Sequence, residues 1–308
     1  MLMIRSKGFL GSDSRGKELV ERVCKWASRT RQNIVVKKVQ VSETFGGKNL
    51  YVGGMSSASK HLIEEISLMR KKIPSLRYIS FLGTSYGGLV VRHVIGKLKM
   101  SSVPARDLHS EEEEDLETWI PCFFVSFLSP FLGAVCERPS WKLSLAPTLF
   151  FFSGAIKELF MKDARAQREP LLLELSKGEY LLGLSRFRTR VVVGSIHDKT
   201  VSLENAFFDL QPLEFFGRVG EEKGESRVLG VKKYAPNGLK PAERGPPFYE
   251  KYAPKETLPH CTQISTNLLN LSFFFVAVTG LHDGPSKAAA SEEVTNKVLE
   301  IVEKNSQF

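Results

Sequence analysis

The sequence has no run of residues that could cross a membrane. Although 42% of its 308 residues are hydrophobic, no stretch holds the roughly 18 consecutive apolar residues that a spanning helix needs. The opening Met1-Leu2-Met3-Ile4 is too short for the apolar core of a signal peptide. We therefore expect a protein that is cytoplasmic or bound peripherally to a membrane.

Cysteine is scarce as well, and its placement argues against the common cysteine-based sites. The four cysteines lack the paired spacing of a zinc site or a redox motif. They are Cys24, Cys122, Cys136 and Cys261. We expect reduced core residues in a reducing compartment, and we expect neither a metal ion nor a cofactor.

Acidic residues are few at one end of the chain. Residues 1–60 hold twelve Lys and Arg against four Asp and Glu, whereas the remaining residues nearly cancel to reach the net charge of +9. Much of this excess lies between Lys17 and Arg31, where helical spacing separates an apolar face from a basic one. The apolar face consists of Leu19, Val20, Val23 and Trp26, and the basic face consists of Arg22, Lys25 and Arg29. The simplest interpretation is a solvated helix face, and the alternative is peripheral docking on an anionic membrane surface. Without aromatic-basic interleaving or a known motif, no nucleic-acid partner is expected.

The sequence does contain a motif for nucleophilic catalysis. Residues 78–92 read YISFLGTSYGGLVVR, which is a short apolar run rich in β-formers, then Gly-x-Ser-x-Gly, then apolar residues at helical spacing. Small neighbours at Gly83 and Gly87 would allow a strained turn that exposes the Ser85 hydroxyl at the sheet edge. We predict the nucleophile elbow of an α/β-hydrolase. The structural alternative is a glycine-rich turn between two core elements.

Strand and helix signals alternate along the whole chain. This order predicts an α/β fold with a mostly parallel central sheet of about six strands and helices on both faces, in a single domain over residues 1–308. Strands are expected near 1–5, 33–41, 78–82, 121–129, 190–195 and 273–278, and helices near 17–31, 56–72, 88–98 and 291–304. Residues 209–260, rich in Gly, Pro and charge, are expected to form a loop-rich excursion.

An interrupted apolar segment is expected to cover the site. Residues 145–156 read LAPTLFFFSGAI, and three consecutive phenylalanines between a proline and a glycine are hard to bury on one helix face. We expect a cap or lid around residues 140–165 that forms an acyl-chain wall or a movable cover. A cap helix packed permanently into the core is the equally weighted alternative.

Candidate site residues follow the strands at their carboxyl ends, where open parallel sheets place their sites. They are the loop from Gly8 to Ser12, then Ser85, Asp198 and His282. Their order, serine then acid then histidine, is that of α/β-hydrolases.

Several segments carry a more specific resemblance. The motifs are SKGFLGS at 6–12, residues 79–92, residues 124–133, and then LFMKD, PLLLELSKGEYLLGLSRFRTRVVV and HDKTV between 159 and 201. In this order they resemble the lipase-like "putative serine esterase" family of the α/β-hydrolase fold, from about residue 6 to the C-terminus and more weakly between 209 and 260. The resemblance implies a serine hydrolase that acts on lipid esters.

The chemistry assigns a role to each candidate. Ser85 would attack an ester carbonyl after His282 takes its proton, while Asp198 orients His282. Oxyanion donors would be the backbone amides of Tyr86 and of Phe9 or Leu10.

Each assignment has an alternative. Asp198 could simply cap a turn. His282 is preferred as the base because it follows the last expected strand; His93 lies within the helix after the elbow, and His197 abuts the acid.

Three loop residues depart from the family pattern. Lys7 and Phe131 stand where the family has histidines, and Thr84 replaces the usual histidine before the serine. None of these is the nucleophile, acid or base. They support a second hypothesis, a catalytically silent hydrolase fold that binds a lipid or a protein.

Overall fold

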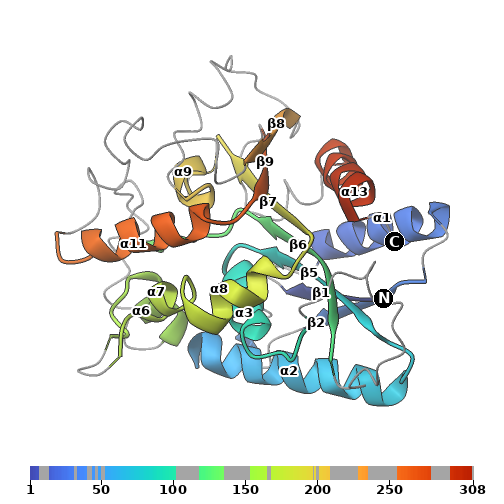
Figure 1. Ribbon diagram of the computed structural model, residues 1–308, viewed down its shortest axis with the longest axis horizontal. Coiled ribbons are helices and arrows are strands. Elements are labelled where there is room, and N and C mark those ends of the chain that lie inside the picture. Colours follow the sequence, from blue (N-terminus) through green and yellow to red (C-terminus); the bar gives the residue numbers. More distant parts are fainter. Residues whose placement is uncertain are drawn as a thin grey trace.

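A mostly parallel sheet forms the centre of the computed structural model (Figure 1). The structure describes residues 1–6, 14–30, 33–39, 44–45, 48–49, 53–101, 118–134, 153–164, 168–196, 198, 201–208, 228–234, 255–278 and 292–306. In these residues, seven strands pair in the order β2-β1-β5-β6-β7-β9-β8. They are β1 (Leu2–Ser6), β2 (Val35–Val39), β5 (Tyr78–Thr84), β6 (Ile120–Phe127), β7 (Thr189–Ser195), β8 (Val228–Tyr234) and β9 (Phe273–Val278). The predicted α/β class is confirmed.

Helices cover both faces of this sheet. One face carries α2 (Gly54–Lys72), α3 (Tyr86–Ile95), α7 (Leu171–Glu174), α8 (Gly178–Ser185), α9 (Leu203–Ala206) and α11 (Leu258–Leu269). The other carries α1 (Ser14–Arg29) and α13 (Glu292–Ser306), which lie side by side in Figure 1. The short α6 (Gly154–Leu159) packs against α2, and β3 (Thr44–Phe45) and β4 (Lys48–Asn49) form a separate antiparallel pair.

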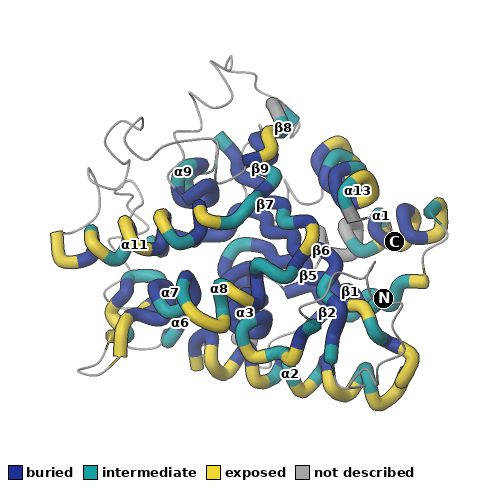
Figure 2. The backbone as a smooth tube through the Cα atoms, viewed as in Figure 1, coloured by how far each residue is buried: buried dark blue, intermediate teal, exposed yellow. Residues whose placement is uncertain are grey.

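Alternation along the strands fills two separate cores. In β5, Ile79 and Phe81 join the core under α2 and α3, whereas Leu82 joins the core under α1 and α13. This follows from the two-residue period of a strand, which sends successive side chains to opposite faces. All ten residues of α3, the helix after the elbow, are buried (Figure 2).

The edge strand β8 is the main departure from the expected fold. It lies inside the interval predicted to be loop-rich and pairs antiparallel with β9, which makes seven strands in place of about six. Its sequence VLGVKKY hides the strand because an edge strand tolerates glycine and lysine, and here the register shifts between Val228 and Gly230. The helix α11, beginning at Leu258, was also not predicted.

The basic helix α1 is oriented as expected, with its apolar residues toward the core. Val23 and Trp26 are buried, while Lys25 and Arg29 are exposed. Cys24 is exposed too, so the prediction that all the cysteines lie in the core is wrong at this position. It points away from the sheet because it sits one residue beyond Val23 on the helix. Cys122 and Cys261 are buried as expected, and Cys136 lies outside the described residues.

No helix among the described residues is both long and apolar enough to cross a membrane.

Candidate active site

Four neighbouring strands end at the edge of the sheet where Ser85 and Asp198 lie. The strands β5, β6, β7 and β9 are consecutive in the sheet and parallel, so their carboxyl ends lie together. Ser85 follows β5 directly, and Asp198 lies three residues beyond the end of β7. The predicted base His282 and the oxyanion-loop residues Phe9 and Leu10 lie outside the described residues. Of the six predicted site residues, three are therefore placed by the structure: Ser85, Tyr86 and Asp198.

Ser85 occupies a strained turn between β5 and α3. Its backbone has φ 54° and ψ −131°, a combination that side-chain-bearing residues adopt only when their surroundings hold them there. The holding contacts are backbone hydrogen bonds: the Ser85 amide donates to the Phe127 carbonyl at 2.8 Å, and the Gly88 amide donates to the Ser85 carbonyl at 2.9 Å. From Phe81 to Ile95, Ser85 alone is not buried. The turn is thus the one point of this stretch that is not closed off by the core.

Gly83 and Gly88 leave no room for a side chain, because β5 and α3 approach closely beside this turn. A Cβ on Gly83 would lie 2.7 Å from the Gly88 nitrogen, and one on Gly88 would lie 2.7 Å from Ser126 Oγ. The Ser126 hydroxyl donates to Ser129 Oγ at 2.6 Å, so the side chains around Gly88 are themselves tied together.

Gly83→Ala should therefore be a severe change. The added methyl group meets the backbone of α3, which can yield only if β5 and α3 separate, so we expect a loss of about 3 kcal/mol in the free energy of unfolding. Chemical denaturation measures it. Gly178→Ala is the control, because a Cβ there meets nothing within 4 Å and only its φ of +48° adds strain. Equal destabilisation by the two variants would show that the tight β5–α3 approach is not what requires glycine.

Asp198 sits in the loop after β7. Its Oδ1 accepts a hydrogen bond of 2.9 Å from the Val201 amide, and its own amide donates to the Ser195 carbonyl. The carboxylate is thereby fixed within the loop. This local bond is what the turn-cap interpretation expects.

Glu158 is a buried carboxylate beside the elbow that the sequence analysis did not identify. Tyr86 Oη donates to its Oε2, and the Met55 amide donates to both of its oxygens at 3.1 and 3.0 Å. It is 8% exposed. The available signal was a charged residue inside the apolar segment around Ile156 and Leu159.

Burial raises the pKa of Glu158 to about 7, against the hydrogen bonds from Tyr86 and Met55, which lower it. Asp163 raises this pKa further and Arg168 lowers it. Because the folded-state pKa lies above the usual 4.5, the contribution of this group to stability is fully present below about pH 4.5 and is lost as the pH rises through about 7.

The part of the predicted cover that is described packs into the core. In α6, Ala155, Ile156 and Glu158 are buried, and Met161 just after it is buried too. For residues 153–164 this agrees with the alternative of a permanently packed cap helix. Residues 140–152, with the three phenylalanines, lie outside the described residues.

His93 has a structural environment, as expected. It is 1% exposed, its Nδ1 lies 2.6 Å from Ser59 Oγ, and its ring stacks on Tyr180. Burial, followed by Lys97 and Arg168, lowers the pKa of His93 to about 3. A neutral imidazole enclosed in the core in this way is not available to Ser85 as a base.

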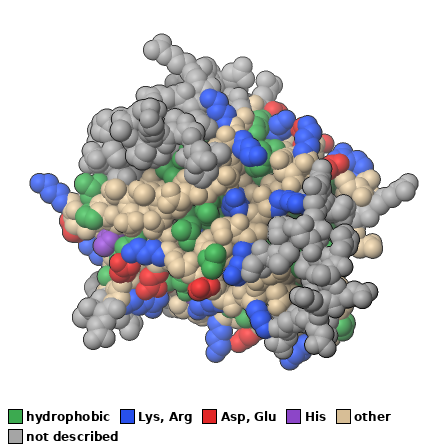
Figure 3. Space-filling model, in the orientation of Figure 1, with side chains coloured by type: hydrophobic (Ala, Val, Ile, Leu, Met, Phe, Trp, Pro, Cys, Tyr) green, Lys and Arg blue, Asp and Glu red, His purple; other side chains and the backbone are tan. Residues whose placement is uncertain are grey.

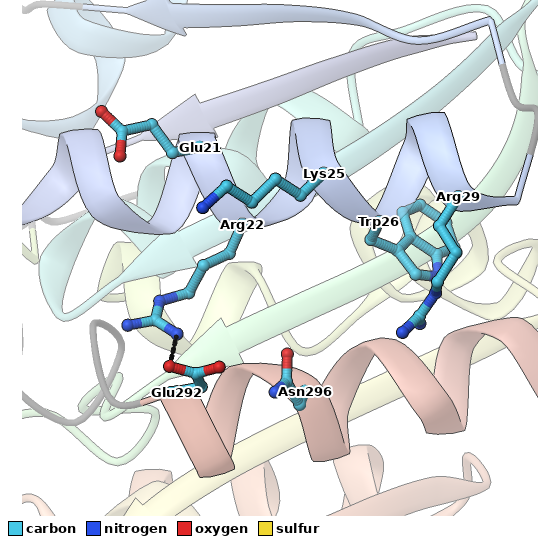
Figure 4. A pocket seen from close by; sticks show the side chains of 7 residues that line it. All are labelled: Glu21, Arg22, Lys25, Trp26, Arg29, Glu292 and Asn296. Carbon is cyan, nitrogen blue, oxygen red and sulfur yellow. Dashed lines mark ion pairs between the residues drawn. The ribbon is translucent and has the colours of Figure 1, made fainter.

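The basic face of α1 borders a pocket of about 270 Å³ between α1 and α13 (Figure 4). Two of its cations meet acids of α13: Arg22 lies 3.0 Å from Glu292, and Arg29 lies 3.7 Å from Glu303. On the face shown in Figure 3, Lys and Arg are spread out among acidic and neutral side chains. These pairs reduce the charge that a membrane would meet. Peripheral contact with anionic lipid stays a prediction.

No group of three or more potential metal ligands occurs within the part of the chain that the structure describes.

Comparisons with known proteins identify a family. The family model "Putative serine esterase (DUF676)" matches residues 2–208. "Putative lipase YDL109C" of Saccharomyces cerevisiae is 28% identical over 206 residues, which cover 66% of this chain but only 29% of the yeast protein.

Two solved structures are similar to this chain at low sequence identity. The esterase PF2001 of Pyrococcus furiosus is 13% identical, with a TM-score of 0.44 over 99% of this chain and 82% of the esterase. An extracellular α/β-hydrolase from a Paenibacillus species is 14% identical, with a TM-score of 0.47 and full coverage of both chains. Since the family model covers most of the chain, including the elbow and Asp198, this protein belongs to the "Putative serine esterase (DUF676)" family.

Proposed function

We propose that this protein is a serine hydrolase that cleaves carboxylic esters of lipids through Ser85, Asp198 and His282. The observation that carries the proposal is the backbone of Ser85: a strained, partly accessible serine at the start of a fully buried helix. Strain of this kind persists only when the surrounding structure over-determines it, and it clusters at active sites. A simple glycine-rich turn would have no need of it.

The proposed reaction has two steps. Ser85 Oγ attacks the ester carbonyl and gives its proton to His282, and the alcohol then leaves with that proton, which produces an acyl-enzyme on Ser85. Water, deprotonated by His282, hydrolyses the acyl group and regenerates the serine. Asp198 keeps the imidazole oriented and stabilises its charged form.

The elbow also supports a site for the oxyanion. Tyr86 is the first residue of α3, and the Ser85 side chain accepts no hydrogen bond from the first amides of this helix. The amino-terminal end of a helix stabilises negative charge, so the Tyr86 amide is suited to hold the developing oxyanion. The second donor in the proposal is the amide of Phe9 or Leu10.

A lipid ester is the proposed substrate class. The yeast relative carries the name of a lipase, and the apolar segment of residues 145–156 follows β6, whose carboxyl end lies beside Ser85. An apolar wall there would gain about 0.8 kcal/mol for each methylene that it removes from water.

Medium-chain and long-chain esters should therefore be better substrates than acetate. Four additional carbons held in such a groove would raise kcat/KM by up to roughly 100-fold. A series of p-nitrophenyl esters from acetate to decanoate, assayed below their aggregation limits, measures this preference. A steady fall of kcat/KM from acetate to the longer chains would contradict the lipid substrate and leave a small-ester hydrolase.

A further inference from the structure

The residue that follows the nucleophile is anchored by a side chain far away in sequence. Tyr86 is 1% exposed, and its hydroxyl donates to Glu158, 72 residues along the chain. Glu158 lies on α6, which has no part in the predicted triad or oxyanion hole. The same carboxylate accepts two hydrogen bonds from the Met55 amide in the first turn of α2. One carboxylate thus connects the elbow, α2 and α6.

The surroundings are shaped for this carboxylate. Gly54 has φ +69°, and a Cβ on it would lie 2.9 Å from Glu158 Cδ, so only glycine leaves the room. The Gly53 cap of α2 contributes no side-chain hydrogen bond, and Glu158 supplies in its place an acceptor at the positive end of that helix. A buried carboxylate is costly to desolvate unless hydrogen bonds compensate for the lost water. The bonds from Tyr86 and Met55 supply this compensation.

The Ser85 carbonyl and the Tyr86 amide belong to one planar peptide group, and the hydrogen bond from the Gly88 amide to that carbonyl holds this group from the backbone side. The contact with Glu158 adds a second anchor, through the Tyr86 side chain. The oxyanion donor proposed above is the Tyr86 amide, which must point to within a few tenths of an ångström of its target to be effective. The Tyr86 side chain connects the residue that carries this amide to Glu158 on α6.

We propose that Glu158 is a positioning residue of the nucleophile elbow, which holds Tyr86 through its hydroxyl so that the amide after Ser85 faces the oxyanion. The proposal rests on the proposed function of Ser85. Glu158 itself does not touch the substrate. Its effect should therefore appear in kcat and in the rate of serine acylation, and not in substrate binding.

Four variants test this role: Tyr86→Phe, Glu158→Leu, Glu158→Gln and the double variant Tyr86→Phe/Glu158→Leu. Loss of the Tyr86 hydroxyl should lower kcat about 10-fold, and Glu158→Leu should lower it up to about 100-fold, the cost of a small misplacement of a reacting group. KM should change less than about twofold in both. Glu158→Gln, which keeps an acceptor and the shape, should recover most of the rate.

The double variant should be no slower than Glu158→Leu alone, because both single changes remove the same contact. Asp163→Ala is the matched control: Asp163 also accepts a hydrogen bond from a helix amide, that of Leu171, at 2.9 Å, and it acts on Glu158 only through its charge, which raises the pKa of Glu158. It should lower the melting temperature and leave kcat unchanged.

A fluorophosphonate probe separates the two ways in which the account could fail. If the wild type does not react, the proposed function is wrong. If the wild type reacts, but Tyr86→Phe and the folded Glu158 variants are acylated at the wild-type rate, Glu158 is purely structural and the positioning role is overturned. Tyr86→Phe alone decides this if Glu158→Leu does not fold.

Discussion

Ser85→Ala is expected to abolish ester hydrolysis without unfolding the protein. Loss of a nucleophile from an acyl-transfer triad typically costs about 10⁴- to 10⁶-fold in kcat. The hydroxyl takes no part in holding the turn, because the Ser85 contacts that fix the elbow are those of its amide and carbonyl. Steady-state hydrolysis of a p-nitrophenyl ester and the melting temperature, measured on the same preparation, test both halves of this expectation.

The neighbouring Thr84 provides the control. Thr84 is 5% exposed, and its hydroxyl has no hydrogen-bond partner among the residues that the structure describes. Thr84→Val should therefore leave hydrolysis within a few-fold of the wild-type rate. Substantial activity in Ser85→Ala, or an equal loss in Thr84→Val, would mean that Ser85 is not the nucleophile.

Asp198→Asn and His282→Ala should have the second-largest effects. An asparagine at the acid position of a triad holds the imidazole in the wrong tautomer and typically lowers kcat about 10⁴-fold, and removing the base costs at least as much. The double variant should be no worse than the more damaging single variant, because the two residues act as one unit. Single-turnover acylation rates measure these losses separately from product release.

His197→Ala is the informative comparison for the base. His197 is adjacent to Asp198 in sequence, yet we expect only a mild change in kcat because the proposed base follows β9 and not β7. Damage equal to that of His282→Ala would reassign the base to His197. Retained activity in Asp198→Asn would support the interpretation of Asp198 as a turn cap, which its bond to the Val201 amide already satisfies.

Much of the fold could be predicted because most of its strands can be recognised from their local sequence. The strand at 273–278 was predicted with the bounds that the structure has, and β7 differs by one residue. The strand β9 is a continuous apolar run and β7 has three consecutive valines at its centre, as expected for strands buried on two faces. The edge strand β8 gave no such signal, since one side of an edge strand is unpaired and its Lys232 and Lys233 are as acceptable there as in a loop.

The elbow was predictable for a similar reason: its residues are contiguous, and the strained turn needs small neighbours that can be read from the sequence. The structure refines the detail, because the closest approach is between Gly83 and Gly88. The contact between Tyr86 and Glu158 was not predictable, because no periodicity relates residues that are 72 positions apart and meet only when α6 packs against α2.

Covalent labelling of the wild-type protein by a fluorophosphonate, followed by mass spectrometry, tests the central claim most directly. Trypsin should release residues 78–92 as one peptide, since Arg77 precedes it and Arg92 ends it. The account predicts a single adduct on this peptide, assigned by fragmentation to Ser85 and not to Ser80, and lost in Ser85→Ala. The absence of any adduct on the folded protein, or an adduct on another residue that persists in Ser85→Ala, would contradict it.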